Sequence, residues 1–120
     1  MEHEHAMYPA SSADIARKRR ALAPKQLEAF RAFSAAAFAE GELDAKTKQL
    51  IAVAVAHVTQ CPYCIRGHTD GALKAGATEG QIMEAIWVAA EMRAGGSYAH
   101  SSLAIDQMAV HAEAAERRKA

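Results

Sequence analysis

This sequence has no excess of positive or negative charge, few aromatic residues and no long apolar run. Its 14 basic and 14 acidic residues cancel to a formal net charge of +0, which argues against nucleic acid or an anionic membrane as a partner. No apolar run approaches the roughly 20 residues of a membrane span. The N-terminus also lacks the hydrophobic core of a signal peptide. We therefore expect a cytoplasmic protein that does not associate with membranes.

Cysteine is equally rare, with two residues in a chain of 120. So few cysteines cannot form the framework of a disulfide-rich secreted domain. The pair, Cys61 and Cys64, is separated by only two residues. A CxxC pair in such a chain indicates a redox-active or metal-binding site.

Aromatic residues make up 6% of the chain and hydrophobic residues 51%, so alanine and the aliphatic residues must form the core. That composition favours closely packed helices over a sheet, and no strand-like alternation occurs. We predict an all-α fold of about five to six helices, with a flexible arm over residues 1–12 and a single domain over residues 13–120. The helices are expected at residues 13–23, 25–39, 45–59, 62–75, 78–93 and 98–118, with a break at residues 94–97.

Local signals mark several of these helix ends. Asp44 is expected to cap the third helix, and Thr78 with Gln81 forms a capping box for the fifth. Gly76 suits the position just beyond the end of the fourth helix. In the third helix the run LIAVAVAHV is apolar nearly all round, which is typical of a helix buried on every side. In a domain of this size we expect a second subunit to supply part of that burial.

The stretch CPYCIRGH, residues 61–68, holds both cysteines and a histidine. Pro62 suits the first position of a helix, where its missing N–H has no intrahelical partner to lose. A residue before proline avoids helical angles, so Cys61 is expected to be the N-cap. Steps of about 100° per residue then place Cys64 about 60° from Cys61, and His68 about 40° from Cys64. The two thiols and the imidazole therefore share one stripe of one helix, in a geometry that permits a reversible disulfide.

This arrangement suits thiol redox chemistry. The helix dipole favours the thiolate of a cysteine at the helix N-terminus, and His68 can accept a thiol proton. A thiolate that attacks a peroxide becomes a sulfenic acid, which condenses with a nearby thiol to a disulfide. One alternative is a structural or inert cysteine pair. Another is a zinc site, but Cys61, Cys64 and His68 supply at most three of the four ligands that structural zinc requires.

Other histidines and two aromatic residues have simpler interpretations. His57 lies four residues before Cys61 and is expected to hydrogen-bond a carbonyl at the end of an apolar helix. Tyr63 and Trp87 are candidates for lining a substrate pocket, with core packing as the alternative. The remaining histidines are not expected to bind metal: His3, His5, His100 and His111.

The run LDAKTKQLIAVAVAHVTQCPYCIRGHTDGALKAGATEGQIMEAIWVAA, residues 43–90, resembles the core of the carboxymuconolactone decarboxylase superfamily. Within it, the CxxC motif followed by histidine resembles the AhpD-like alkylhydroperoxidase branch. The resemblance extends over about residues 25–110. Its specific part combines the apolar segment before the cysteines, the CxxCxxxH motif itself and the ALKAGAT segment after it.

The resemblance implies an AhpD-like helical bundle that assembles into trimers or hexamers through apolar helices. It also implies peroxide reduction with no cofactor beyond the Cys61–Cys64 disulfide, to which a protein or small-thiol reductant returns electrons. By position, Cys64 matches the cysteine that attacks peroxide, Cys61 the resolving cysteine and His68 the relay histidine. The N-cap argument instead favours Cys61 as the more acidic thiol. We expect Cys64 to attack, because His68 lies one helical turn from it.

One position departs from the peroxidase pattern. Twelve residues before the first cysteine the family has glutamate, whereas this chain has Gln49. Glutamine neither takes nor gives a proton at neutral pH, so we expect Gln49 to orient His68 or a water, with His57 as another candidate for the relay. Two alternative functions stay open. A dithiol–disulfide adaptor would carry electrons between partners without reacting with peroxide. Lactone decarboxylation, the superfamily's named reaction, does not depend on a redox CxxC motif, so the motif argues against it.

Overall fold

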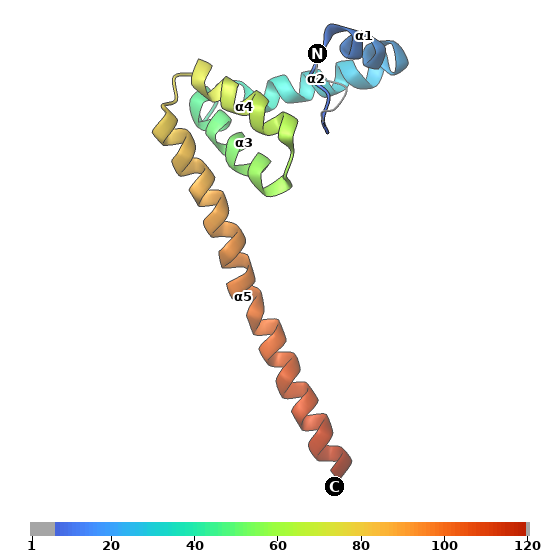
Figure 1. Ribbon diagram of the computed structural model, residues 1–120, viewed down its shortest axis with the longest axis vertical. Helices are drawn as coiled ribbons and strands as arrows, with labels where there is room; N and C mark the ends of the chain where they lie inside the picture. The colour runs from blue at the N-terminus through green and yellow to red at the C-terminus, as the bar shows by residue number, and fades with distance from the viewer. Residues whose placement is uncertain (1–6, 120) are drawn as a thin grey trace.

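The computed structural model describes residues 7–119, and within this range the chain is helical with no strand (Figure 1). The predicted all-α fold is confirmed. Residues 1–6, with His3 and His5, lie outside the described range, and residues 7–12 contain no helix. The division into an arm and a domain therefore stays a prediction. The described residues form five helices: α1 (Ala13–Leu22), α2 (Pro24–Phe38), α3 (Ala45–Thr59), α4 (Pro62–Lys74) and α5 (Glu79–Lys119).

Side chains at the helix starts explain where α3 and α5 begin. The Asp44 carboxylate accepts the backbone N–H of Thr47 at 2.7 Å, and this hydrogen bond lowers the pKa of Asp44. Thr78 and Gln81 exchange two hydrogen bonds of 3.0 Å, each side chain accepting the backbone N–H of the other residue. Such bonds satisfy N–H groups that have no partner within the helix. Both predicted caps are confirmed.

The helix α4 begins and ends as the sequence predicts. Cys61 is its N-cap and Pro62 its first residue. The chain passes from α3 to α4 through Gln60, whose φ of 59° lies in the left-handed region. Beyond α4, Gly76 takes a φ of 96°, a conformation that a side chain would strain. The sharp turn at Gln60 folds α4 back alongside α3 (Figure 1).

The predicted break at residues 94–97 is wrong, because α5 runs without interruption for 41 residues. Glycine weakens a helix interior by about 1 kcal/mol relative to alanine, but its backbone still forms the helical hydrogen bonds. Gly95 and Gly96 both lie inside α5, and the Gly96 carbonyl also accepts a bond from His100 Nδ1 at 3.0 Å. The chain has no proline after Pro62, so no residue in this segment lacks the N–H that a helix requires.

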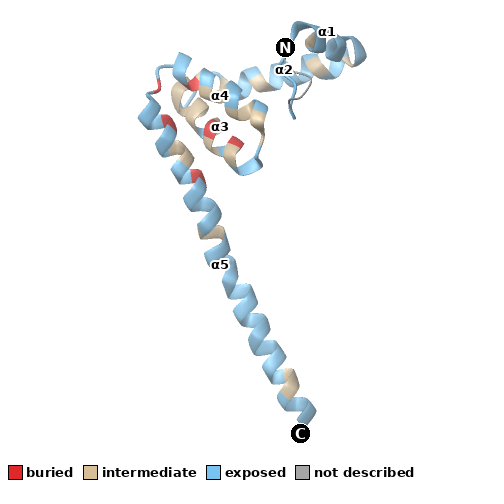
Figure 2. Ribbon diagram, in the orientation of Figure 1, coloured by how far each residue is buried: buried red, intermediate tan, exposed pale blue. Residues whose placement is uncertain are grey.

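The core lies between α3, α4 and the first turns of α5. Figure 2 shows the buried positions confined to this part of the described chain. The cluster is built from small and aliphatic side chains: Val53, Ala72, Ala77 and Ile82, with Leu50 and Ile86 packed against them. These residues hold α3 against α4, and this pairing positions the cysteine helix.

Most of α5 projects from this core as a single rod (Figures 1 and 2). The radius of gyration is 21.9 Å, whereas a compact chain of this length has about 14 Å. The accessible surface is 9674 Å², against about 6,300 Å² for a compact protein of this mass. On α3, Ile51, Val55 and Val58 are also exposed. The chain by itself therefore does not bury α3 on every side.

Residues 7–119 contain no helix with the combination of length and hydropathy needed to cross a membrane.

Candidate active site

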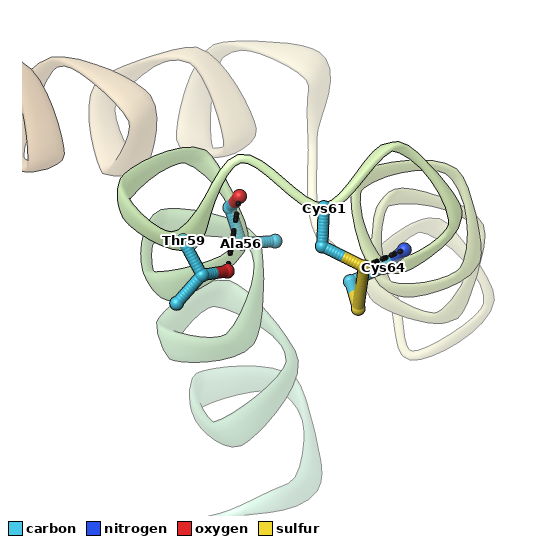
Figure 3. The surroundings of a disulfide bond; sticks show 4 residues. All are labelled: Ala56, Thr59, Cys61 and Cys64. Atoms are coloured by element: carbon cyan, nitrogen blue, oxygen red, sulfur yellow. Dashed lines mark hydrogen bonds between the residues drawn. A yellow bond between two sulfur atoms is a disulfide. The ribbon is translucent and has the colours of Figure 1, made fainter. Parts of the chain in front are cut away.

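A disulfide joins Cys61 to Cys64 at the start of α4 (Figure 3). Their Cα atoms are 5.2 Å apart, inside the usual range of roughly 4.4–6.8 Å. The end of α3 fixes this start, because the Ala56 carbonyl accepts both the Cys61 N–H at 3.2 Å and the Thr59 hydroxyl at 3.4 Å. The Cys64 backbone N–H in turn donates to Cys61 Sγ at 3.2 Å. Donors at a helix N-terminus favour negative charge on such a sulfur once the disulfide is reduced.

The His68 ring is held from two sides. Its Nδ1 lies 2.9 Å from Gln49 Oε1 on α3. The ring of Phe38, at the end of α2, stacks on it with 5.0 Å between centroids and 16° between planes. An amide oxygen only accepts hydrogen bonds, so this contact is a hydrogen bond when the proton of the neutral imidazole lies on Nδ1. The other ring nitrogen, Nε2, then carries the lone pair that can accept a proton.

A cavity of about 480 Å³ opens beside the disulfide, and both Cys64 and His68 line it. Cys61 is not among its lining residues. Lys48 contributes a cationic group, and its ammonium donates to the Ala39 carbonyl at 2.6 Å. The walls are otherwise mostly apolar and come from α2, α3 and the loop between them: Ala37, Phe38, Leu43, Ile51, Ala52, Val55, Ala56 and Thr59.

The other residues singled out in the sequence lie outside this cavity. His57 bonds through Nδ1 to the Val53 carbonyl at 2.8 Å, as expected for a histidine at the end of an apolar helix. Tyr63 lines a different hollow, where it packs edge-on against Tyr8 and donates its hydroxyl to the Pro9 carbonyl at 2.8 Å. Trp87 is 68% exposed on α5. In the part of the chain that the structure describes, no three His, Cys, Asp or Glu side chains gather as a metal site would require.

Phe38 is a site residue that the sequence pattern did not reveal. Nothing in its position near the end of α2 singles it out, yet its ring packs on His68, thirty positions later in the chain. Lys48 lies in the polar first turn of α3, where nothing in the sequence distinguishes it from its polar neighbours. Neither local spacing nor residue type marks such long-range neighbours.

Residues 24–107 match the profile of the carboxymuconolactone decarboxylase family. The chain belongs to this family. The matched range includes every residue of the site: Phe38, Gln49, Cys61, Cys64 and His68. The resemblance drawn from the motif is therefore confirmed, and the family includes enzymes and AhpD-like proteins.

Individual proteins and solved structures extend this similarity. Protein 4 of the cox locus in Paracoccus denitrificans is 68% identical over 78 residues, which cover 65% of this chain and 70% of that protein. A crystal structure from Methanobacterium thermoautotrophicum superposes with a TM-score of 0.64 and 41% identity, over 67% of this chain and 90% of the other. A family protein from Thermotoga maritima, for which a role in the antioxidative response has been suggested, gives a TM-score of 0.51 and 33% identity over 53% and 66% of the two chains.

Proposed function

We propose that this protein is a thiol-dependent peroxidase of the AhpD-like kind, which reduces peroxides through the Cys61–Cys64 dithiol with His68 as proton acceptor. The observation that carries the proposal is the shared cavity, since Cys64 and His68 both line one largely apolar hollow beside the disulfide. Its volume of about 480 Å³ is typical of sites for small molecules. The antioxidative role suggested for the Thermotoga relative points the same way.

The first step oxidises Cys64. In the reduced protein, His68 Nε2 takes the Cys64 thiol proton, directly or through one water. The thiolate then attacks the outer oxygen of a hydroperoxide ROOH, so that an S–O bond forms while the O–O bond breaks. The departing alkoxide takes the proton from His68 and leaves as an alcohol. Cys64 is left as a sulfenic acid, oxidised by two electrons.

The second step forms the disulfide through Cys61. The Cys61 thiolate attacks the sulfenic sulfur of Cys64, and hydroxide leaves as water after taking up the proton that Cys61 released. The Cys64 N–H, which already donates to Cys61 Sγ, favours this thiolate. A protein or small-thiol reductant then returns two electrons to the disulfide. The cycle requires no metal or organic cofactor.

On this mechanism the proton relay ends at His68. Gln49 holds the ring at 2.9 Å, but its amide neither takes nor gives a proton at neutral pH. The Nδ1 of His57 hydrogen-bonds the Val53 carbonyl, and this contact gives no support to a role for His57 in the relay. Protons therefore exchange between His68 and the solvent in the cavity.

We also propose that the protein works as a homo-oligomer, with the trimer and the hexamer as the candidate forms. A single chain leaves about 3,400 Å² more surface accessible than a compact protein of its mass would. The projecting part of α5 and the outer face of α3 are exposed in the single chain (Figure 2). Both carry large exposed apolar side chains, which a second copy would cover. A dithiol that must be returned to its reduced form also fits a cytoplasmic location.

The test is to count free thiols in the reduced protein over time after hydrogen peroxide or an organic hydroperoxide is added. We expect both thiols to be lost together, and Cys64→Ser to abolish the reaction. In Cys61→Ser the attack still occurs, so intact mass should show one added oxygen on Cys64.

Other outcomes would change the proposal. Thiol loss only with a disulfide compound, and not with peroxide, would indicate the dithiol–disulfide adaptor and overturn the peroxidase. A sulfenic acid in Cys64→Ser, with none in Cys61→Ser, would reverse the roles of the two cysteines. Metal analysis of the purified protein tests the zinc alternative.

A further inference from the structure

The contact between His68 and Gln49 depends on space that a glycine leaves open. Gly71 lies three residues after His68 on α4, beside the end of the Gln49 side chain. A Cβ atom added to Gly71 would lie 2.6 Å from Gln49 Oε1, 2.9 Å from its Cδ and 3.3 Å from its Nε2. These distances are shorter than van der Waals contact, so the Gln49 amide occupies the volume that any side chain at position 71 would need.

We propose that Gly71 is a positioning residue for His68. The absence of a side chain at Gly71 admits the Gln49 amide, which accepts the Nδ1–H of His68 and leaves Nε2 free to take the thiol proton. This inference rests on the proposed peroxidase function for its effect on rate. Its effect on the imidazole tautomer is independent of that function.

The backbone gives no other reason for glycine at this position. Gly71 lies inside α4 and, unlike Gly76, has no positive φ. Glycine in a helix interior is less favourable than alanine, so its presence needs an explanation in packing. Gly67 lies one turn earlier on the same helix, and a Cβ added there would meet nothing within 4 Å. Of these two helical glycines, only Gly71 opens onto the group that holds His68.

A clash at Gly71 would move Gln49 and not the helices. The atoms nearest the added Cβ belong to the end of a flexible side chain, which can rotate away at small cost. His68 cannot follow that movement, because Phe38 stacks on its ring. Gly71→Ala is therefore expected to leave the fold intact and to break the bond between Gln49 and Nδ1.

The direct test is nitrogen NMR of the histidine rings in the oxidised protein, the state with the disulfide closed. We expect His68 to carry its proton on Nδ1 in the wild type and in the matched control Gly67→Ala. In Gly71→Ala the proton should move towards Nε2, the position that a free histidine side chain favours. An unchanged Nδ1–H tautomer in Gly71→Ala would overturn the proposal, whether or not the protein reacts with peroxide.

The second test is the rate of thiol oxidation by hydrogen peroxide in the reduced proteins. Gly71→Ala should react roughly 10–100-fold more slowly, since small displacements of a supporting group have effects of this size. Gly67→Ala should match the wild type. In a Gln49→Ala background, Gly71→Ala should cause no further slowing, because it acts through Gln49. A slowing of full size in that background would show that Gly71 acts by another route and would overturn the proposal.

Folding of the variants is checked by thermal unfolding. If Gly71→Ala fails to fold, the double variant Gly71→Ala/Gln49→Ala removes the clashing amide and should fold again. A double variant that still fails would show that the clash is not with Gln49, and the proposal would be wrong. If wild-type thiols do not react with peroxide, the proposed function fails while the tautomer comparison still decides the role of Gly71.

Discussion

A line of large apolar side chains on α5 offers the sharpest test of assembly. Trp87, Tyr98 and Ile105 are spaced by eleven and seven residues, which returns a helix to within about 20° of the same direction. In the single chain their exposed fractions are 68%, 83% and 63%. Tyr98 and Ile105 lie beyond Ala89, the last buried residue of α5. We expect Ile105→Glu to break the assembly.

The size of the effect follows from the exposure of Ile105. Complete burial of an isoleucine side chain stabilises by about 1.5–3 kcal/mol. Because 63% of Ile105 is still exposed in the single chain, its burial in an interface would contribute about 1–2 kcal/mol per chain. Glutamate loses this contribution and also places an unpaired charge in an apolar contact, which adds a further penalty. Each 1.4 kcal/mol corresponds to about a tenfold change in an equilibrium constant.

The assay is light scattering coupled to size-exclusion chromatography at micromolar concentration, together with thermal unfolding. The wild type should elute at three or six times the chain mass of 12.8 kDa, and Ile105→Glu should shift towards the single-chain mass with a lower melting temperature. Ser102→Glu is the matched control. It adds the same charge to the same helix, on a polar line that already contains Glu84, Glu91 and Glu113.

Two results would refute this reasoning. A wild-type protein that elutes as a single chain and still melts cooperatively would show that the exposed surface needs no partner. Equal dissociation of Ile105→Glu and Ser102→Glu would show that added charge, and not the apolar line, weakens the assembly.

Three further predictions concern the site and its supports. Gln49→Glu should raise the rate of thiol oxidation by peroxide, because a carboxylate beside Nδ1 would stabilise the protonated ring of His68; an unchanged or lower rate would contradict this. Phe38→Leu should slow the same reaction several-fold by releasing the ring of His68, whereas Phe33→Leu, an exposed position on the same helix, should not. The hydrogen bond from the Thr47 N–H lowers the pKa of Asp44 in the folded protein. The stability that the ionised Asp44 cap contributes is therefore complete above the unfolded-state pKa of about 3.9. It is lost as pH falls through the lower folded-state pKa. Denaturant unfolding from pH 6 to pH 2 should show this loss in the wild type and not in Asp44→Asn, which keeps a capping oxygen without titrating there.

The helix starts could be predicted from the sequence because the bonds that fix them are local. The Asp44 side chain accepts the N–H of a residue three positions later, and Thr78 and Gln81 each accept the other's backbone N–H over the same sequence separation. The N-cap at Cys61 follows in the same way from the proline after it. Each of these features depends on a few neighbouring residues, which a short stretch of sequence contains in full.

The break at Gly95 and Gly96 could not be decided locally. Two adjacent glycines weaken a helix and also occur in loops, so their presence alone does not decide whether the helix continues through them. The contacts of His68 also could not be predicted from the local sequence. Gln49 reaches it from α3, nineteen residues earlier in the chain, and Phe38 reaches it from α2. Spacing within α4 predicted that His68 shares a stripe with the cysteines, but it holds no information about the partners that other helices supply.

The two cysteines lie in different surroundings, and this difference reconciles the two arguments about which sulfur attacks. Cys64 lines the cavity beside His68, so access to an oxidant favours it in the proposed oxidation. Cys61 accepts the Cys64 N–H at the helix N-terminus, which stabilises a thiolate there without opening it to the cavity. A stabilised thiolate is also the better leaving group when a reductant opens a disulfide. On the proposed mechanism, the acidity expected at Cys61 would serve the return of electrons and access at Cys64 would serve their removal, so the more acidic sulfur need not be the one that reacts with the peroxide.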